Sequence, residues 1–206
     1  MKTDYWNAFY SGNFTLDIPS QFCAMFCQEA EKGASVIEFG CGNGRDSRVM
    51  ASHGFRVLGV DAAQSAIDYC SHRAGDAIGK SLNYLRGDVS ELDLAPLREF
   101  SSGGKFYIYS RFFQHSISEE EQEAMLDGMD ALRQNLAAAY FEFRNADDEN
   151  TKKVFGEHYR RYQTPEYFRH AIERRGFKVA YEVSGKGYAK YFEEDPSVTR
   201  VIAVLS

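Results

Sequence analysis

The residues "EFGCGNGRDS", numbers 38 to 47, decide how this chain folds. Gly40, Gly42 and Gly44 take three of five consecutive positions, shortly after the acidic residue Glu38. Glycine loses more conformational freedom on folding than any other residue, so this density indicates a turn with unusual dihedrals or a close ligand. An apolar run (34–40) precedes the turn, and a helical pattern follows it over 44–53. The stretch therefore predicts a buried strand, a glycine turn and a helix.

The alternation of strand and helix continues along the chain. Six more strands are predicted at 55–61, 82–88, 105–112, 136–145, 177–185 and 199–206, and further helices at 18–33, 62–75, 116–135 and 164–176. The segment 91–100 is predicted as a short, proline-interrupted helix or an irregular crossover. Such alternation predicts an α/β protein with a mostly parallel sheet covered by helices on both faces. The last two strands are joined only by "KGYAKYFEEDPSV", which is too short for a helical crossover, so they are predicted to form an antiparallel hairpin.

Composition limits the function classes. A chain of 206 residues fits one domain, here an N-terminal lid and helix (1–33) and a core (34–206). A net charge of −6 argues against broad nucleic-acid binding. The cysteines (Cys23, Cys27, Cys41 and Cys70) lack zinc-site spacing and are predicted to be free thiols in a reducing compartment. No signal peptide or membrane span is predicted, so a cytoplasmic location is expected.

The glycine turn departs from two phosphate-binding patterns. In the dinucleotide fingerprint G-x-G-x-x-G, the third glycine would fall on Arg45, and no Gly-Lys-Ser/Thr of a P-loop follows. The pattern E-x-G-x-G-x-G instead resembles motif I of the class I S-adenosylmethionine-dependent methyltransferases. The resemblance covers about residues 34 to 206 and implies a Rossmann-like seven-stranded sheet ending in an antiparallel hairpin.

The resemblance also implies the cofactor S-adenosyl-L-methionine and the residues that bind it. Asp61 ends the second strand, where the family contacts the ribose, and Asp88 follows the third, where the adenine is bound. The full predicted set is Glu38, Gly40, Cys41, Gly42, Asp61, Ala62, Asp88, Val89, Ser110, Trp6 and Tyr10. Alone, each aspartate could instead cap a helix or turn. A purely structural role explains Glu38 less well, because burying an unpartnered carboxylate costs several kcal/mol.

The first fourteen residues are unusually aromatic, with Tyr5, Trp6, Tyr10 and Phe14. Aromatic rings can exclude water and stack on a cationic sulfonium. We therefore expect a lid over the cofactor; packing on the edge of the sheet is the alternative.

The acceptor side is predicted from residues at the ends of the fourth and fifth strands. "YIYSRFFQHSI" lacks the Asn/Asp-Pro-Pro-Tyr/Phe motif of DNA and glutamine methyltransferases, but offers Arg111 and His115 as catalytic candidates. His115 would be the base for a hydroxyl acceptor. Substrate binding is predicted for Arg111, Arg144, Arg160 and Arg161, because guanidinium groups pair well with phosphate and carboxylate. The alternatives are a loop or cap role for His115 and ion pairs for the arginines.

These residues predict methyl transfer to a small anionic or glycan-linked acceptor, whether phosphate, carboxylate or hydroxyl, with no metal. "SRFFQHSI" and "HYRRY" are similar to a bacterial subgroup associated with polysaccharides and small metabolites. Two alternatives stay open. The same cofactor could support cyclisation or aminocarboxypropyl transfer, or the chain could be a non-catalytic cofactor-binding module. No nucleic-acid partner is expected.

Overall fold

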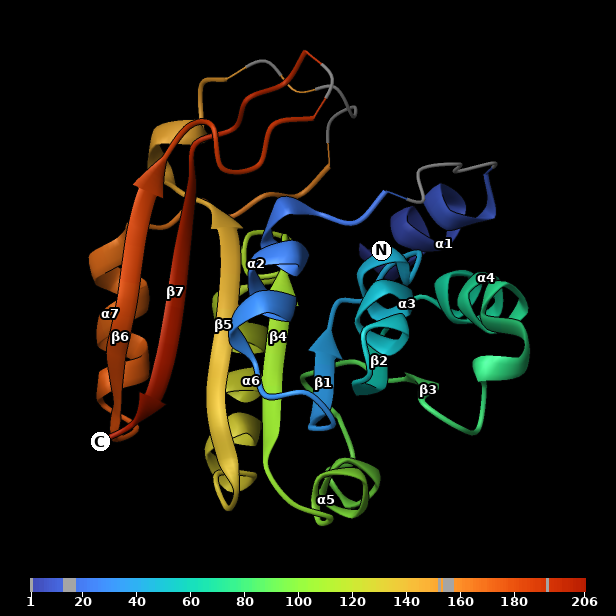
Figure 1. Ribbon diagram of the computed structural model, residues 1–206. Coiled ribbons are helices and arrows are strands. Elements are labelled where there is room, and N and C mark those ends of the chain that lie inside the picture. Colours follow the sequence, from blue (N-terminus) through green and yellow to red (C-terminus); the bar gives the residue numbers. More distant parts are fainter. Residues whose placement is uncertain (1, 13–17, 152, 154–157, 192) are drawn as a thin grey trace.

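The computed structural model describes residues 2–12, 18–151, 153, 158–191 and 193–206. A single seven-stranded sheet has the order β3-β2-β1-β4-β5-β7-β6 (Figure 1). Its strands are β1 (Ser35–Phe39), β2 (Arg56–Asp61), β3 (Leu82–Arg86), β4 (Phe106–Arg111), β5 (Leu136–Arg144), β6 (Phe177–Gly185) and β7 (Val198–Leu205). The helices are α1 (Lys2–Ser11), α2 (Gln21–Glu29), α3 (Arg45–Ser52), α4 (Gln64–Ala74), α5 (Ala95–Ser101), α6 (Glu119–Ala131) and α7 (Pro165–Glu173).

The strand directions confirm the predicted fold class. The first five strands pair in parallel, and β7 lies antiparallel between β5 and β6, which is the expected terminal hairpin. The chain moves outward from β1 to β3 and then returns to β4 on the other side of β1. Ligands of open α/β sheets bind at such a reversal, beyond the carboxyl ends of the strands. A ligand-binding site is therefore expected beyond the carboxyl ends of β1 and β4.

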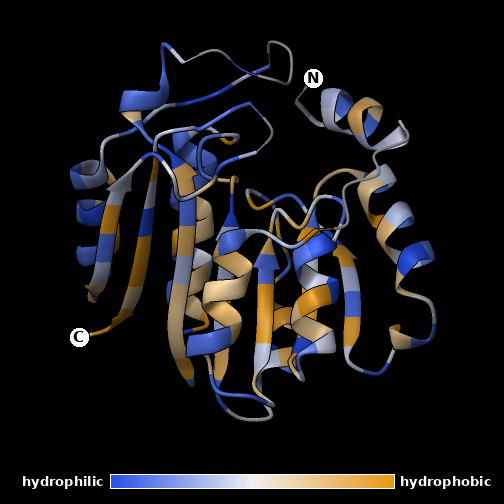
Figure 2. Cartoon of the chain, turned by 45° about the horizontal axis from the view of Figure 1, so that its top comes forward, coloured by the Kyte–Doolittle hydropathy of each residue, from blue (hydrophilic) through white to orange (hydrophobic). Residues whose placement is uncertain are grey.

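Helices cover both faces of the sheet. On one face, the helices α2 and α3 pack on the strands through Phe22, Phe26 and Met50. Tyr107 and Tyr109 of β4 belong to the same buried cluster. The other face carries the apolar residues of α5, α6 and α7, among them Leu97, Met125, Leu126, Met129, Phe168 and Ile172. Apolar residues accordingly concentrate in the strands, as the hydropathy colouring shows (Figure 2). Burial on both faces holds the strand ends in fixed positions.

Side-chain caps begin the helices where the sequence predicts them. The Ser20 hydroxyl accepts a hydrogen bond from the Cys23 amide, and Thr164 caps α7 in the same way. Ser118 and Glu121 form the expected capping box at the start of α6. These contacts satisfy amide groups that would otherwise lack partners in the first turn of each helix.

The N-terminal helix α1 packs on α4. The Ser65 hydroxyl donates to the Asn7 carbonyl at 2.9 Å, and the Ser65 amide donates to Asn7 Oδ1 at 3.1 Å. This contact brings α1 to the end of the sheet at which β1 and β4 terminate (Figure 1). Phe14, one of the four aromatic residues predicted for the lid, lies outside the described residues.

Among the helices that the structure describes, none is long and apolar enough to cross a membrane. The four cysteines are buried free thiols. No group of histidine, cysteine or acidic side chains suited to a metal ion occurs within the described part of the chain.

Candidate active site

The glycine turn after β1 has the backbone conformation that its composition predicts. Gly40 and Gly42 have φ angles of 70° and 53°, in the left-handed region that side chains disfavour. A Cβ atom on Gly40 would come within 2.4 Å of the Phe113 ring, and one on Gly42 within 2.4 Å of the Tyr10 hydroxyl. Both glycines are therefore required by close packing as well as by dihedral angle.

Asp61, at the end of β2, holds this turn in place. Its carboxylate accepts hydrogen bonds at 2.9 Å from the Gly42 amide and from the Ala63 amide. Burial raises the pKa of the carboxyl, while these amide bonds oppose that shift. The predicted alternative, a cap at the start of α4, is not formed: the N-cap residue is Ala63, and no side-chain cap bond is present there. The same residue also lines a pocket, together with Ala62, Asp88 and Val89.

We call this cavity the aspartate pocket; it is lined chiefly by residues 60–63, 87–89, 112–113 and 116–117 and by side chains of α1. Asp88 Oδ1 accepts from the amide and the hydroxyl of Ser90, which fixes the loop after β3. The predicted cofactor residues at the ends of β2 and β3 are therefore brought together here.

A second cavity adjoins the first. We call it the arginine pocket, because Arg45, Arg111, Arg144 and Arg160 line it, along with Glu38, the glycine turn and His115. Trp6, Tyr10, Gly40, Phe112 and Ser116 line both cavities. The two pockets thus meet beside Gly40, beneath α1, where the Trp6 and Tyr10 rings stack with centroids 5.9 Å apart.

Glu38 is buried in the wall of the arginine pocket and accepts a short hydrogen bond from the Ser47 hydroxyl. Burial raises its pKa to about 8, and the nearby Asp46 carboxylate adds to the shift. The carboxyl is therefore largely protonated at neutral pH. A cation that enters this pocket would favour the ionised form.

This shift predicts a pH dependence of cofactor affinity. If the cofactor's ammonium pairs with ionised Glu38, binding below pH 8 must release a proton from a carboxyl whose pKa is about 8. The apparent affinity should then rise about tenfold per pH unit between about pH 6 and pH 8, and level off above. Calorimetry across this range would test the expectation, and Glu38→Gln should flatten the profile. A flat profile in the unaltered protein would show that Glu38 does not meet the ammonium.

Ser110 does not reach either pocket, contrary to the prediction that it binds the cofactor. Its side chain is fully buried, and its hydroxyl bonds the Phe39 carbonyl at 3.2 Å and the Gln114 side chain. The residue joins β4 to β1 within the sheet. We therefore withdraw Ser110 from the candidate site. Cys41, another residue predicted to bind the cofactor, lines the arginine pocket.

Two of the predicted arginines are held by buried ion pairs at the strand ends. Arg111 Nε lies 2.8 Å from Glu142, and Arg144 contacts Asp148 at 2.7 Å and Glu194 at 2.5 Å. The ion-pair alternative therefore applies to both, although both guanidinium groups also line the pocket. They flank the Phe112 ring, with Cζ atoms 4.2 and 5.3 Å from its centroid.

Phe112 carries backbone strain at this point. Its φ angle of 54° is unusual for a bulky side chain, and its amide donates to the Glu142 carbonyl at 2.7 Å. Strained residues of this kind concentrate at functional sites. Phe112 lies where the two pockets meet, because it lines both of them.

His115 is buried, and its orientation is fixed by the backbone. Nδ1 accepts a hydrogen bond from the Arg144 amide at 3.2 Å. Burial lowers its pKa well below the usual value, and the positive charges of Arg144, Arg160, His158 and Arg111 lower it further. The ring is therefore neutral with its proton on Nε2, so it can donate a hydrogen bond but is a poor base.

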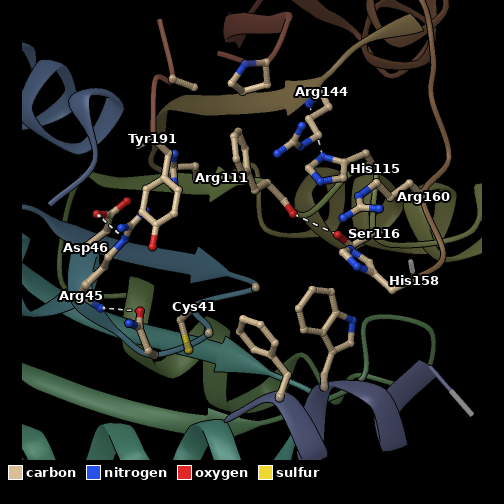
Figure 3. A pocket seen from close by; sticks show the side chains of 18 of the residues that line it. Cys41, Arg45, Asp46, Arg111, His115, Ser116, Arg144, His158, Arg160 and Tyr191 are labelled. Atoms are coloured by element: carbon tan, nitrogen blue, oxygen red, sulfur yellow. Dashed lines mark hydrogen bonds and ion pairs between the residues drawn. The ribbon is translucent and has the colours of Figure 1, made fainter. Parts of the chain in front are cut away.

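The adjacent residues Arg160 and Arg161 point to different environments. Arg160 lines the arginine pocket with His158 (Figure 3). Arg161 bonds Gln122 Oε1 at 2.6 Å and the Ile117 carbonyl, and its amide donates to the His115 carbonyl at 2.7 Å. Arg161 anchors the segment instead of lining the pocket, so its predicted substrate role is withdrawn.

The pocket residues that were absent from the predicted set include Arg45, Asp46, Tyr191 and Glu194. A signal existed for Arg45, because a cation in the first turn of a helix opposes the helix dipole and has no structural benefit there. Asp46 is buried and accepts hydrogen bonds from Ser20 and Tyr109. Tyr191 and Glu194 come from the long β6–β7 connection, whose path over the site follows from tertiary packing.

The donor set suits S-adenosylmethionine. A buried carboxyl (Glu38) lies beside a side-chain-free turn, and three further carboxylates (Asp61, Asp88 and Glu121) line the adjoining pocket. A methionine chain needs close approach to the backbone and a partner for its ammonium, whereas a ribose needs hydroxyl acceptors. No basic side chain lines the described part of the aspartate pocket, which disfavours a pyrophosphate there.

Comparison with known proteins supports this interpretation. Residues 36–136 match the family model described as a methyltransferase domain. That range contains the glycine turn, Asp61, Asp88 and the loop after β4. This segment therefore resembles a methyltransferase domain, in agreement with the S-adenosylmethionine-dependent methyltransferase that the glycine turn predicts.

Individual relatives agree with this methyltransferase assignment. A stretch of 58 residues is 36% identical to ubiquinone biosynthesis O-methyltransferase of Rickettsia conorii (strain ATCC VR-613 / Malish 7), covering 28% of this chain. The match spans only 20% of the length of that curated relative.

Two solved structures share the fold. One, from work on the conversion of a disulfide bond into a thioacetal group in echinomycin biosynthesis, is 14% identical with a TM-score of 0.73, covering 100% of this chain and 94% of that one. The other is magnesium protoporphyrin IX methyltransferase of Synechocystis PCC 6803 with bound S-adenosylmethionine, 19% identical with a TM-score of 0.64, covering 89% of this chain and 76% of that one. Both likenesses confirm the predicted fold.

Proposed function

We propose that this methyltransferase domain methylates a small anionic acceptor whose own oxyanion is the nucleophile. The observation that carries the proposal is the junction of two pockets of opposite character beside Gly40. One pocket is lined by aspartates, and the other by four arginines and two histidines. A single connected site can thus hold a sulfonium nucleoside and an anion next to each other.

On the cofactor side, Glu38 would meet the ammonium, Asp61 the ribose hydroxyls, and the loop at Asp88–Val89 the adenine. The backbone of Gly40 and Gly42 would run along the methionine portion. When bound, S-adenosylmethionine supplies an electrophilic methyl group whose thioether leaving group needs no further activation. The protein's contribution is then to hold the acceptor close and aligned.

On the acceptor side, the described residues offer cations and hydrogen-bond donors in place of a base. Each carboxylate in the arginine pocket already has a partner: Glu38 has Ser47, Asp46 has Ser20 and Tyr109, and Glu194 has Arg144. His115 uses Nδ1 to accept from the backbone. A hydroxyl acceptor would need its proton removed, whereas a phosphate or carboxylate oxygen is already ionised. The geometry therefore favours the second kind.

Aromatic side chains would exclude water from the reaction. Trp6, Phe9 and Tyr10 of α1 line the arginine pocket from one side, and Tyr191 and Pro196 line it from the β6–β7 connection. Removing water strengthens the attraction between an anion and the arginines. We infer that α1 acts as the predicted lid.

Replacing His115 by glutamine tests whether a base is used. Glutamine keeps a donor and an acceptor but cannot take up a proton. We expect kcat/KM to fall by no more than about tenfold, since loss of a general base typically costs 10² to 10⁴. Steady-state kinetics over a pH range would measure it. A loss above about 10²-fold, together with disappearance of an inflection near neutral pH, would restore His115 as the base.

The by-product tests the function as a whole. Incubation with S-adenosylmethionine and a panel of phosphates, phosphonates, carboxylates and alcohols should yield S-adenosylhomocysteine. Methylthioadenosine would indicate cyclisation or aminocarboxypropyl transfer, and tight cofactor binding without turnover would indicate a non-catalytic module. Both alternatives are less favoured, because the arginine pocket offers a site for an acceptor directly beside the aspartate pocket.

We further propose a single catalytic domain over 1–206 that belongs to a bacterial subgroup acting on polysaccharide precursors or other small metabolites in the cytoplasm. The motifs "SRFFQHSI" and "HYRRY" support the subgroup, and the four buried free thiols are consistent with a reducing compartment.

A further inference from the structure

We propose that the acceptor is a carboxylic acid attached to an aromatic ring. Its carboxylate would bind the guanidinium of Arg111, and its ring would lie among the aromatic side chains of the arginine pocket. The inference rests on the proposed function and narrows the acceptor to a small metabolite with a planar ring.

Arg111 offers a fixed pair of donors for such an acid. Its Nε donates to Glu142 at 2.8 Å, and Arg200 donates at 2.7 Å to the other oxygen of this fully buried carboxylate. Among the described residues, no hydrogen bond uses the two terminal amino groups of Arg111, whereas both of those on Arg144 are taken by buried carboxylates. Two parallel N–H donors match the two oxygens of a planar carboxylate.

The Phe112 ring marks the end of the pocket at which this acid would lie. Its centroid is 4.2 Å from Arg111 Cζ, and Phe112 lines both the arginine pocket and the aspartate pocket. A carboxylate on Arg111 would therefore lie near the place where the two pockets meet. The rest of the acceptor would extend into the arginine pocket.

Aromatic side chains line the arginine pocket from separate parts of the chain. Phe9 of α1 and Tyr191 of the β6–β7 connection line it and are absent from the described walls of the aspartate pocket. Covering the cofactor therefore does not account for them. Tyr191 lies across the cavity from His158, whose ring meets the Trp6 ring edge-on at 5.1 Å (Figure 3). Rings on separate walls suit a flat ligand, which can make stacked or edge contacts with them.

A sugar acid and a saturated ring fit these walls less well. Sugar hydroxyls need hydrogen-bond acceptors, but the carboxyl groups of the arginine pocket already bond within the protein, as described above for Glu38, Asp46 and Glu194. A saturated ring would gain from burial of its apolar surface but has no π-face to stack. The aromatic acid uses both the paired donors and the rings.

Methyl transfer to this acid needs no base. A lone pair of one carboxylate oxygen forms the new O–CH3 bond, the S–CH3 electron pair stays on sulfur, and the product is a methyl ester. No proton moves, which agrees with a neutral His115 whose Nδ1 is occupied by the Arg144 amide.

Three ligands of equal charge test the inference by binding alone. Benzoate, cyclohexanecarboxylate and glucuronate each carry one carboxylate on a six-membered ring, but only benzoate is aromatic. Each is titrated into protein saturated with S-adenosylhomocysteine. Binding is followed by calorimetry and by the fluorescence of Trp6, which lines the pocket and is the sole tryptophan of the chain.

Benzoate should bind about three- to tenfold more tightly than cyclohexanecarboxylate, because ring contacts add to the effect of burial. Burial of apolar surface alone would favour the saturated ring, so the order of the two affinities is informative. Benzoate should also bind more tightly than glucuronate.

Matched substitutions locate the binding site. Tyr191→Leu removes a ring but keeps apolar bulk, so the preference for benzoate over cyclohexanecarboxylate should fall below about twofold, whereas Tyr191→Phe should keep it. Arg111→Lys keeps the charge but loses the paired donors, and should weaken both acids about tenfold without changing the affinity for S-adenosylhomocysteine. Tyr181→Leu, at an exposed tyrosine of β6, is the control and should change nothing.

Equal or tighter binding of cyclohexanecarboxylate or glucuronate, or no binding of any of the three acids while S-adenosylhomocysteine binds, would overturn the aromatic acid and leave the proposed function standing. A preference for benzoate that persists in Tyr191→Leu, or unchanged acid binding in Arg111→Lys, would overturn its placement. Failure of S-adenosylhomocysteine itself to bind would instead contradict the proposed function, on which the inference depends.

Discussion

Replacement of Gly40 by alanine should weaken binding of S-adenosylmethionine by about 100-fold. The backbone at this position has a φ of 70°, which costs a residue with a side chain about 1 to 2 kcal/mol. The added Cβ would also come within 2.4 Å of the Phe113 ring, and within 2.9 Å of Phe113 Cβ, which cannot move without the loop. Since Phe113 lines the aspartate pocket, that displacement would reach the cofactor site.

A matched control separates strain from contact. Gly54 has a φ of 92°, but nothing lies within 4 Å of the position that its Cβ would occupy. Gly54→Ala should therefore lower the melting temperature without changing cofactor affinity. Calorimetry on both variants would measure the difference. Cofactor affinity within about threefold of the unaltered protein for Gly40→Ala would mean that the cofactor does not use this turn.

Asp61→Ala should weaken cofactor binding by 10- to 100-fold, about 1.4 to 2.8 kcal/mol. The substitution removes the predicted acceptor for the ribose and also the bond at 2.9 Å that fixes the Gly42 amide. Asp61→Asn should lose less, because its side-chain oxygen can still accept from one amide. Asp68→Ala in α4 removes an exposed carboxylate and should leave affinity unchanged. Unaltered binding by Asp61→Ala would remove this residue from the cofactor site.

Much of the fold is readable in the sequence because local signals and tertiary structure agree. The glycine turn, the caps at Ser20, Ser118 and Thr164, the end of β2 at Asp61 and the turn at Asp88 after β3 each have a local physical cause. Since parallel strands end at one edge of the sheet, the two aspartates could be expected to line the same pocket, and they do.

Side-chain direction outside regular elements was not predictable in the same way. Arg160 and Arg161 are neighbours in an irregular segment without periodicity, so nothing local indicates which one faces the pocket and which one bonds Gln122. Ser110 lies near a strand end, as cofactor residues do, but its side chain is buried on a covered face of the sheet, where it bonds the Phe39 carbonyl and Gln114. The predicted set therefore included residues that face elsewhere, such as Arg161, and missed others that line the pocket, such as Arg45.

The role of His115 depends on a contact between residues far apart in sequence. The Arg144 amide, 29 positions away, occupies Nδ1 and so fixes the tautomer. The sequence places a histidine near the acceptor, but its tautomer depends on how β4 and β5 are packed. The change from a predicted base to a hydrogen-bond donor follows from that single contact.

The most direct test of the central claim is a crystal structure of the protein with S-adenosylhomocysteine. We expect the ribose at Asp61, the adenine beside Asp88 and Val89, and the homocysteine portion along Gly40–Gly42 near Glu38, with its sulfur facing the arginine pocket. Ligand density away from these residues, or a ribose without contact to Asp61, would contradict the account.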